Sequence, residues 1–329
     1  MKKTVLVLFA SALVLGLAFT GFAQNPEKVH LVMGYIPNVQ FAPWYVALEK
    51  GFFQENGLEL TMDYGKVNDV MRLLAAGEVD FAIAGGDEVI MARSQGIPVT
   101  YLAALYARFP AAIISLSETG ITTPADLKGK SIGLPGFYGT NYIAIKAVLA
   151  SAGLDETQVV LRPIGYTQVP SLTQGKVDAV VGFANNEPIQ LRQLGQEITV
   201  IPADDYFDLV GHGVVAGEKI IKENPELVRK FVDATIKGMR YALDHPEETF
   251  EICKKYIPEL DKTNETAQYK VLLESMKLWQ NELTREKGLG YSDPAFWTES
   301  QQLMKDWGLI EKTVPASEVM TNEFLPQLS

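Results

Sequence analysis

Two short motifs in the sequence resemble catalytic signatures, and neither lies where its chemistry requires. Gly129-Lys130-Ser131-Ile132-Gly133 matches the G-x-S-x-G pattern of a serine nucleophile. That serine needs a sharp turn after a strand, whereas Ser131 is expected to open a strand. The same Gly-Lys-Ser triplet matches the end of a phosphate-binding loop, but the glycine required five positions earlier is Pro124. The two motifs therefore indicate neither a nucleophile nor a nucleotide site.

The other groups that could do acid–base or metal chemistry are scattered. His30, His212 and His245 form no metal-ligand spacing, and we interpret His212 as a structural residue near a hinge. Carboxylate pairs such as Asp204-Asp205 and Glu247-Glu248 are typical of solvated loops and helix starts. We expect no catalytic residue, no cofactor and no metal.

A binding site is indicated instead by loops that follow predicted strands. In open α/β sheets these loops face the ligand crevice. Four loops, at residues 35–44, 85–88, 136–141 and 185–187, are rich in aromatic, amide and glycine residues, and Tyr106 and Tyr206 are expected to join them at a hinge. The candidate ligand-binding residues are Tyr35, Asn38, Gln40, Phe41, Trp44, Gly85, Gly86, Asp87, Tyr106, Phe137, Tyr138, Gly139, Thr140, Asn141, Asn185, Glu187 and Tyr206.

These residue types favour a planar ligand. Tyr, Phe and Trp stack on flat rings, while Asn, Asp and Glu form hydrogen bonds with ring N–H and carbonyl groups. Arginine is absent from the four loops, although Arg108 is close. An oxyanion held by the helix amino termini after Gly86 and Gly139 is the alternative.

A repeat in the sequence predicts how these loops are positioned. Residues 73–89 and 171–187 share Gly-x-Val-Asp at an offset of 98 positions, and the same offset carries Pro37 onto Pro135. Each copy follows a strand, HLVMGYI or SIGL, and a helical pattern at 43–53 or 140–152. The chain is therefore expected to hold two similar β-α-β-α-β units.

The predicted fold is α/β, with two lobes of mostly parallel sheet flanked by helices and two hinge crossings near residues 115 and 207. Lobe 1 is expected to be discontinuous, from residues 24–115 and 207–329, and lobe 2 to span residues 116–206. HGVVAG at 212–217 is expected to return to lobe 1 as a strand. Helices are predicted from Asn224 onward and at 247–256, 264–283 and 294–307.

Composition narrows the class of partner. The 329-residue chain carries a net charge of −11, which disfavours nucleic acid and anionic membranes. Its length favours two domains. The single cysteine, Cys253, cannot form an internal disulfide, so burial of the 47% hydrophobic residues must hold the fold together.

The amino terminus has the pattern of an export signal. Lys2 and Lys3 precede an apolar run from Val5 to Leu17 and a small-residue site at Gly21-Phe22-Ala23. Residues 1–23 are thus predicted to be a signal peptide cleaved near Ala23, and a membrane anchor is the competing interpretation. No cysteine lies near this site, so there is no lipobox and we expect a free periplasmic protein.

Four segments together resemble a known family. They are YIPNVQFAPWYVALEKGFFQENGLEL (35–60), GEVDFAIAGGDEV (77–89), DLKGKSIGLPG (126–136) and NPELVRKFVDATIKGMRYALDHPEE (224–248). They are similar to the periplasmic substrate-binding proteins of ABC importers, in the branch related to thiamine-pyrimidine-precursor, riboflavin, alkanesulfonate and nitrate binders. The resemblance spans nearly the whole chain after residue 23.

The resemblance implies the type II periplasmic-binding-protein fold and a monomeric, non-enzymatic clamp. Such a protein binds one small nutrient between its lobes and delivers it to an inner-membrane ABC permease driven by an ATPase. The I-P-N-V-Q-F-A-P form of the first segment looks most like members that bind riboflavin-like or aminopyrimidine ligands. An oxyanion such as an alkanesulfonate or nitrate remains an alternative, as does an enzyme of pyrimidine and thiamine biosynthesis. Fungal synthases of the family carry a cysteine-rich segment and need a metal, from which this chain, with only Cys253, departs.

Overall fold

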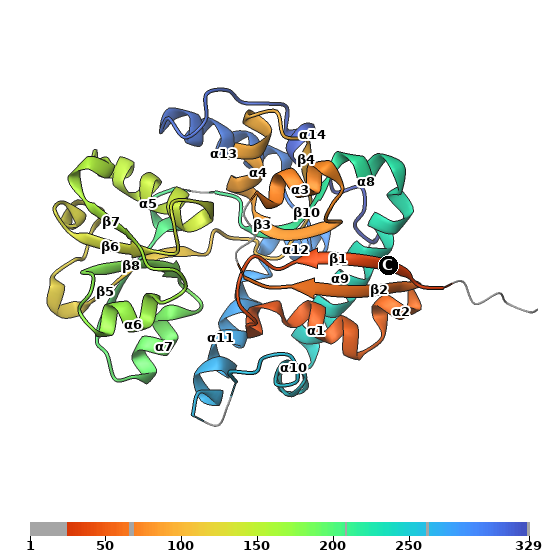
Figure 1. The fold of residues 1–329 in the computed structure, drawn as a ribbon, viewed down its shortest axis with the longest axis horizontal. Coiled ribbons are helices and arrows are strands. Elements are labelled where there is room, and N and C mark those ends of the chain that lie inside the picture. Colours follow the sequence, from red (N-terminus) through yellow and green to blue (C-terminus); the bar gives the residue numbers. More distant parts are fainter. Residues whose placement is uncertain (1–24, 66–68, 208, 261–262, 328–329) are drawn as a thin grey trace, which may run out of the picture.

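Two five-stranded sheets form the centres of two lobes. The computed structural model describes residues 25–65, 69–207, 209–260 and 263–327 (Figure 1). The first sheet has the order β2-β1-β3-β10-β4 and the second the order β7-β6-β8-β5-β9. Their strands are β1 (Glu27–Val32), β2 (Leu58–Asp63), β3 (Phe81–Gly85), β4 (Val99–Ala104), β5 (Ala111–Leu116), β6 (Ser131–Leu134), β7 (Val160–Pro163), β8 (Ala179–Phe183), β9 (Ile198–Pro202) and β10 (His212–Gly217).

The two sheets have equivalent topologies. In each, one strand, β1 or β6, pairs in parallel with both of its neighbours, and one strand, β10 or β5, is antiparallel to both of its neighbours. The expected return of residues 212–217 to the first lobe is confirmed, since β10 lies between β3 and β4. Each sheet thus contains one strand that enters after a crossing from the other lobe.

The first crossing lies earlier than predicted. β5 pairs with β8 and β9 of the second sheet, so the chain leaves the first lobe between Ala104 and Ala111 rather than near residue 115. The second crossing lies between Pro202 and His212, the segment that contains residue 207. The crossing was predicted too late in the chain because β5, a short apolar strand, was assigned to the first lobe.

The repeated Val-Asp pairs have the same structural role in both lobes. Asp80 accepts a hydrogen bond from the backbone N–H of His30 on β1, at 2.8 Å. Asp178 accepts hydrogen bonds from the backbone N–H and the hydroxyl of Ser131 on β6, at 2.7 and 2.6 Å. The two carboxylates thereby anchor equivalent strands, β1 within its length and β6 at its start. Ser131 is thus occupied in a structural contact.

Helices cover both sheets, and the elements from α8 onward pack mainly on the first lobe, with α11 also contacting α7 of the second (Figure 1). The α-helices are α1 (Ala42–Glu49), α2 (Phe52–Glu55), α3 (Val70–Ala76), α4 (Gly86–Ser94), α5 (Gly139–Ser151), α6 (Gln168–Thr173), α7 (Glu187–Gln193), α8 (Glu218–Glu223), α9 (Pro225–Asp244), α10 (Pro246–Cys253), α11 (Glu265–Leu278), α12 (Glu282–Lys287), α13 (Pro294–Asp306) and α14 (Ala316–Val319). Short 3₁₀ helices are η1 (Val39–Phe41), η2 (Ser117–Thr119), η3 (Pro124–Leu127), η4 (Glu156–Gln158) and η5 (Ala203–Asp205).

Two local predictions from the sequence need correction. The strand HLVMGYI ends at Val32, and the chain then turns through Gly34, whose φ of +69° favours glycine. The helix expected at 43–53 is broken into α1 and α2 at Gly51, which has a φ of +76°. The loop that carries Tyr35 and Asn38 is therefore longer than the sequence pattern indicates.

Helix α9 packs directly against α1 behind the first sheet. Asn224 caps α9 as predicted, because its side chain accepts a hydrogen bond from the backbone N–H of Leu227. Close packing of the two helices depends on Gly238, where an added Cβ would lie 2.1 Å from the carbonyl oxygen of Pro43. Trp44 and Phe231 are fully buried in the same core.

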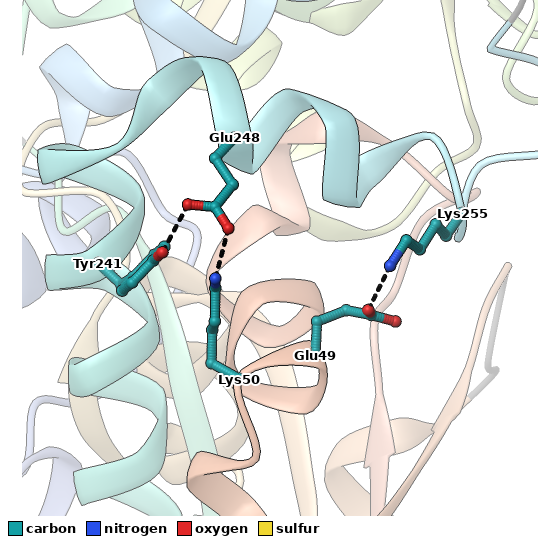
Figure 2. A network of polar contacts seen from close by, with 5 residues as sticks. All are labelled: Glu49, Lys50, Tyr241, Glu248 and Lys255. Atoms are coloured by element: carbon teal, nitrogen blue, oxygen red, sulfur yellow. Dashed lines mark hydrogen bonds and ion pairs between the residues drawn. The ribbon is translucent and has the colours of Figure 1, made fainter.

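Exposed ion pairs add contacts between α1, α9 and α10. Lys50, just after α1, contacts Glu248 of α10, and the hydroxyl of Tyr241 on α9 donates a hydrogen bond to the same carboxylate at 2.6 Å (Figure 2). Lys255 pairs with Glu49 at 2.5 Å. Exposed pairs of this kind each contribute about 0–1 kcal/mol, so the buried helix faces supply most of the stability.

Candidate functional site

A cavity of about 160 Å³ lies between the two lobes, at the carboxyl ends of their strands. By the same measure a single water needs about 10–15 Å³, so the space takes an organic molecule of many atoms. Aromatic side chains from both lobes make up much of its lining: Tyr35, Phe41, Tyr106, Tyr138, Tyr166 and Phe183. We call this space the inner cavity.

Nine of the candidate residues from the sequence line the inner cavity. Their side chains come from the loop before α1, from the first crossing and from the amino termini of α5 and α7. They are Tyr35, Gln40, Phe41, Tyr106, Tyr138, Gly139, Thr140, Asn141 and Glu187. Asn38 lines an adjoining outer cavity of about 200 Å³.

The expectation that Trp44 faces the cleft is wrong. Its side chain is completely buried in the core behind the first sheet, with its ring 6.3 Å from that of Phe41. Residue 44 lies in the first turn of α1, on the side that packs against the protein interior. Phe41, three residues earlier, is the ring that reaches the cavity.

Gly85, Gly86 and Asp87 hold the cavity wall together but do not line it. An added Cβ at Gly85 would lie 2.3 Å from the hydroxyl of Thr140 in the other lobe, and one at Gly86 would lie 2.4 Å from Val210. Asp87 is fully buried and accepts a hydrogen bond from the Thr140 hydroxyl at 2.9 Å. Glycine is needed at position 85 because Asp87 and Thr140 approach it, and at position 86 because Val210 packs against it.

Three further candidates lie outside the lining of either cavity. Phe137 is 55% exposed and packs edge-on against Tyr142, and Tyr206 is 43% exposed. Asn185 is buried behind the lining, where its amide donates hydrogen bonds to Gln40 at 3.0 Å and to Ser275 at 2.8 Å. It supports Gln40 and does not reach the cavity itself.

Several lining residues were missed by the sequence reasoning. Tyr166 and Gln168 follow β7, and Val70 follows β2. β2 and β7 are the second strands of the two repeated units, whereas the predicted loops follow the first and third strands. The loops after all three strands of each unit include Tyr166, Gln168 and Val70. Glu88 and Asn186 lie within the loops considered but were not selected. The remaining missed residues are Val32, Met33, Gly34, Ile83, Ala84, Leu105, Pro135, Phe183 and His212.

The described lining carries two carboxyl groups, Glu88 and Glu187, and neither a lysine nor an arginine. Desolvation raises the pKa of Glu187 to about 7 and also raises that of Glu88. Desolvation lowers the pKa of His212 to about 4, so the imidazole is neutral at physiological pH. The cavity therefore disfavours an anionic ligand, because its lining supplies carboxyl groups and no cation. The groups that it presents to a ligand are neutral or weakly charged.

Most of the helix amino termini at the cavity are already occupied. Glu88 accepts a hydrogen bond from the backbone N–H of Gly85 at 3.0 Å, and Glu187 accepts one from that of Phe183 at 2.7 Å. The start of α5, at Gly139, Thr140 and Asn141, lines the cavity without an acidic residue in its first turn. One of the two termini proposed for an oxyanion is thus taken by the protein's own carboxylate.

Two polar atoms of the lining residues have no hydrogen-bond partner among the described residues. They are the side-chain oxygen of Asn141 and Nδ1 of His212, and both are buried. Such atoms are costly to leave unpaired, and both belong to side chains that line the cavity. His212, interpreted from the sequence as structural, is therefore a candidate binding residue at the end of β10.

The lobes contact each other directly across the cleft. Besides Asp87 and Thr140, the hydroxyl of Tyr166 donates to the carbonyl oxygen of Gly34 at 3.1 Å, and the rings of Tyr35 and Tyr166 meet edge to face at 4.8 Å. These contacts join loops that are far apart in the sequence. They join the two lobes beside the inner cavity.

The arrangement suits recognition of a flat molecule by stacking and hydrogen bonds. Rings from both lobes offer aromatic faces and edges, and the amides of Gln40, Asn141, Gln168 and Asn186 offer donors and acceptors. Within the described ranges, no group of three or more His, Cys, Asp or Glu side chains could hold a metal ion. In the same part of the chain, none of the helices is long and apolar enough to cross a bilayer. The predicted signal peptide lies outside the described residues.

The sequence matches the profile of a known family and several characterised relatives. The family is described as NMT1/THI5 like, and the match covers residues 38–249. The riboflavin-binding protein RibY of Chloroflexus aurantiacus is 41% identical over 91% of this chain and 86% of its own length. The formylaminopyrimidine-binding protein of Halalkalibacterium halodurans is 27% identical over 90% of each chain.

Two further similarities bear on the alternatives. A 4-amino-5-hydroxymethyl-2-methylpyrimidine phosphate synthase of Legionella pneumophila is 27% identical over 91% of this chain and 93% of its own length. Among solved structures, the periplasmic aliphatic sulphonate binding protein SsuA of Escherichia coli has a TM-score of 0.66 at 15% identity, over 92% of this chain and 94% of that one. The structural similarity confirms the expected two-lobed periplasmic-binding-protein fold.

Proposed function

The chain belongs to the NMT1/THI5-like family, and on that premise we propose that it is the extracytoplasmic solute-binding component of an ABC importer. It captures a small planar heterocycle, riboflavin-like or an aminopyrimidine, between its lobes and delivers it to a permease driven by an ATPase. In this proposal the protein is exported, acts as a monomer and catalyses no reaction.

The observation that carries the proposal is the lining of the inner cavity. Aromatic rings from both lobes surround it, amides and two carboxyl groups supply hydrogen bonds, and the described lining includes neither lysine nor arginine. A flat, neutral or weakly charged ring system satisfies this environment, because it offers faces to stack and edge N–H and C=O groups to pair. The names of the two binding-protein relatives, for riboflavin and formylaminopyrimidine, support the same ligand class.

An oxyanion such as an alkanesulfonate or nitrate is the second candidate. It is favoured by the amino terminus of α5, which opens into the cavity without its own acidic residue. It is opposed by Glu88 and Glu187, whose carboxyl groups line the same space. The similarity to a sulphonate-binding structure concerns the fold alone, since the identity is 15%.

A pyrimidine-forming enzyme is the third candidate, because the Legionella relative carries that name. Ser131, the one serine with a nucleophile-like motif, is held by Asp178 at the start of β6 and lines neither cavity. Mass spectrometry of the protein after incubation with candidate heterocycles separates the two functions. A binding protein returns the ligand unchanged, whereas an enzyme yields a product of different mass.

Thermal unfolding across a ligand panel tests the proposal. The panel contains riboflavin, an aminopyrimidine, taurine as a sulfonate, and nitrate. A ligand at 100 times its Kd stabilises the folded state by about 2.7 kcal/mol, so the melting temperature rises clearly only with a true ligand. We expect a rise with at least one heterocycle and none with the anions. A flat response to both heterocycles would contradict the proposed ligand class.

A matched pair of variants links the response to the cavity. Tyr166→Ala removes a lining ring, and Tyr206→Ala removes an exposed ring outside the lining. Loss of a stacked ring should weaken binding about tenfold in Tyr166→Ala, since base-like rings stacked on aromatic side chains gain about 1–3 kcal/mol. Tyr206→Ala should bind as the unmodified protein does.

A further inference from the structure

A second cavity adjoins the inner one and widens the space that a ligand can occupy. This outer cavity, of about 200 Å³, lies between the loop at residues 35–38, the α6–α7 side of the second lobe and the residues around α11. Tyr35, Tyr166, Gln168 and Glu187 line both cavities, so the two spaces meet at these four residues. A single ligand can therefore extend from one cavity into the other.

The outer cavity differs in chemistry from the inner one. Five amide side chains line it: Asn38, Gln168, Gln190, Asn264 and Gln268. Tyr35 and Tyr166 are its only aromatic residues among those described, and both stand at the junction. Primary amides both donate and accept hydrogen bonds, which matches hydroxyl groups that do the same.

The charge of the outer cavity further restricts which chemical group of a ligand can occupy it. Glu187 and Glu259 line it, and within the described residues it has neither a lysine nor an arginine in its lining. A phosphate or carboxylate on the ligand would lie near two carboxyl groups with no cation to balance it. A neutral chain that carries several hydroxyl groups fits both the amides and the acidic side chains.

Gln168 connects the two environments. Its side chain is 97% buried, being 3% exposed, and lines both cavities. Its primary amide can both donate and accept hydrogen bonds at this position. A polar atom of a ligand at the junction of ring and chain would pair with it.

We propose that the outer cavity is a subsite for a neutral polyhydroxylated chain attached to the planar ring bound in the inner cavity. This inference rests on the proposed function and specifies its substrate class. The ligand has two parts, a flat head held by aromatic rings and a polyol tail held by amides. A heterocycle without such a tail makes no hydrogen bonds with the amides of the outer cavity and binds more weakly.

Paired flavins test the subsite directly. Riboflavin carries a ribityl chain on its three-ring head, lumiflavin has a methyl group in its place, and riboflavin 5′-phosphate adds a terminal phosphate. Affinity is measured by the quenching of flavin fluorescence on titration with the full-length protein. We expect riboflavin to bind at least tenfold more tightly than lumiflavin, and the phosphate to bind more weakly than riboflavin.

A variant confined to the outer cavity separates the tail from the head. Gln268→Leu on α11 alters the outer cavity alone, and Gln174→Leu, an exposed glutamine after α6, is the matched control. Loss of one hydrogen bond should weaken riboflavin binding about three- to tenfold in Gln268→Leu and leave lumiflavin binding unchanged. The control should bind both flavins as the unmodified protein does.

The outcomes distinguish this inference from the function on which it rests. Equal binding of riboflavin and lumiflavin, with no selective effect of Gln268→Leu, overturns the polyol subsite and leaves the heterocycle-binding function standing. Binding of an aminopyrimidine but of neither flavin also overturns the polyol subsite and leaves the heterocycle-binding function standing. Binding of no heterocycle at all overturns the proposed function and the subsite together. Tighter binding of the phosphate than of riboflavin overturns the neutral character assigned to the tail.

Discussion

Glu187 is a carboxyl group that the fold buries at the junction of the two cavities. Its oxygen atoms accept hydrogen bonds from the backbone N–H of Phe183 and the side chain of Asn186, at 2.7 and 3.3 Å. Desolvation outweighs these contacts and raises its pKa from 4.5 to about 7. The group therefore holds a proton in the folded protein at a pH where the unfolded chain has released it.

This raised pKa predicts a pH-dependent loss of stability. Between pH 4.5 and 7 the folded state binds the proton of Glu187 more strongly, so this residue lowers the free energy of unfolding as pH rises, by about 3 kcal/mol in total. His212 has the opposite effect, because its folded pKa of about 4 lies below the ordinary 6.5 and stability rises with pH in that window. The two contributions partly cancel in the unmodified protein.

Glu187→Gln isolates the carboxyl contribution. The difference in free energy of unfolding between variant and unmodified protein should shift in favour of the variant by about 3 kcal/mol from pH 4.5 to 8. Urea unfolding of the empty proteins at several pH values measures it, and His212 is common to both. A difference that stays constant with pH would show that Glu187 titrates normally.

The sequence did not show whether the Trp44 side chain points into the cavity or into the core, because tryptophan occurs in both places. Trp44→Ala is expected to lower the free energy of unfolding by about 3–5 kcal/mol, because it removes a fully buried indole. Ligand affinity measured below the melting temperature should change little, since Trp44 does not line the cavity. A large loss of affinity with unchanged stability would place the indole in the site after all.

At the scale of elements, the contact between α1 and α9 supports the loop that carries Gln40 and Phe41. Gly238→Ala should lower stability by about 1–3 kcal/mol, because the new methyl group would lie 2.1 Å from the carbonyl oxygen of Pro43. This loss opposes the usual gain from replacing glycine by alanine in a helix.

A neighbouring substitution on the exposed side of α9 controls for helix propensity. Lys237→Ala removes only an ion pair with Asp233 that contributes a few tenths of a kcal/mol, so its melting temperature should be nearly unchanged. Equal melting temperatures for Gly238→Ala and Lys237→Ala would show that the helices can separate without loss.

The repeat allowed much of the fold to be predicted from the sequence. Turn glycines, the Val-Asp pairs and the strand patterns recur at one offset, and the structure shows that Asp80 and Asp178 fix equivalent strands. The crossing at Ala104 to Ala111 could not be placed, because β5 has the same apolar pattern whichever sheet it joins. Strand membership depends on pairing between distant segments, which single-sequence patterns do not encode.

The repeat also allowed part of the candidate site to be predicted from the sequence. Residues in the loops after the first and third strands of each unit were found, since those loops follow from topology alone. Which side chain of a loop faces the cavity depends on the local turn, so Trp44 and Phe137 were assigned wrongly. Tyr166 and Gln168 were missed because the loop after the second strand was not considered.

At the scale of the whole molecule, the contacts between Asp87 and Thr140 and between Tyr166 and Gly34 join the two lobes. Opening of these contacts would widen the entrance to the inner cavity, and a ligand bound between the lobes would hold them together. Small-angle X-ray scattering should therefore show a smaller radius of gyration with saturating riboflavin than without it. Superimposable curves in the two conditions would argue against closure on the ligand.

The central claim, that the clamp selects a neutral planar heterocycle, is tested most directly by native mass spectrometry of the protein in an equimolar mixture of riboflavin, an aminopyrimidine, taurine and nitrate. We predict a complex of one protein with one heterocycle, and riboflavin as the heterocycle if the outer cavity holds a polyol tail. A complex with taurine or nitrate in place of a heterocycle would contradict the account.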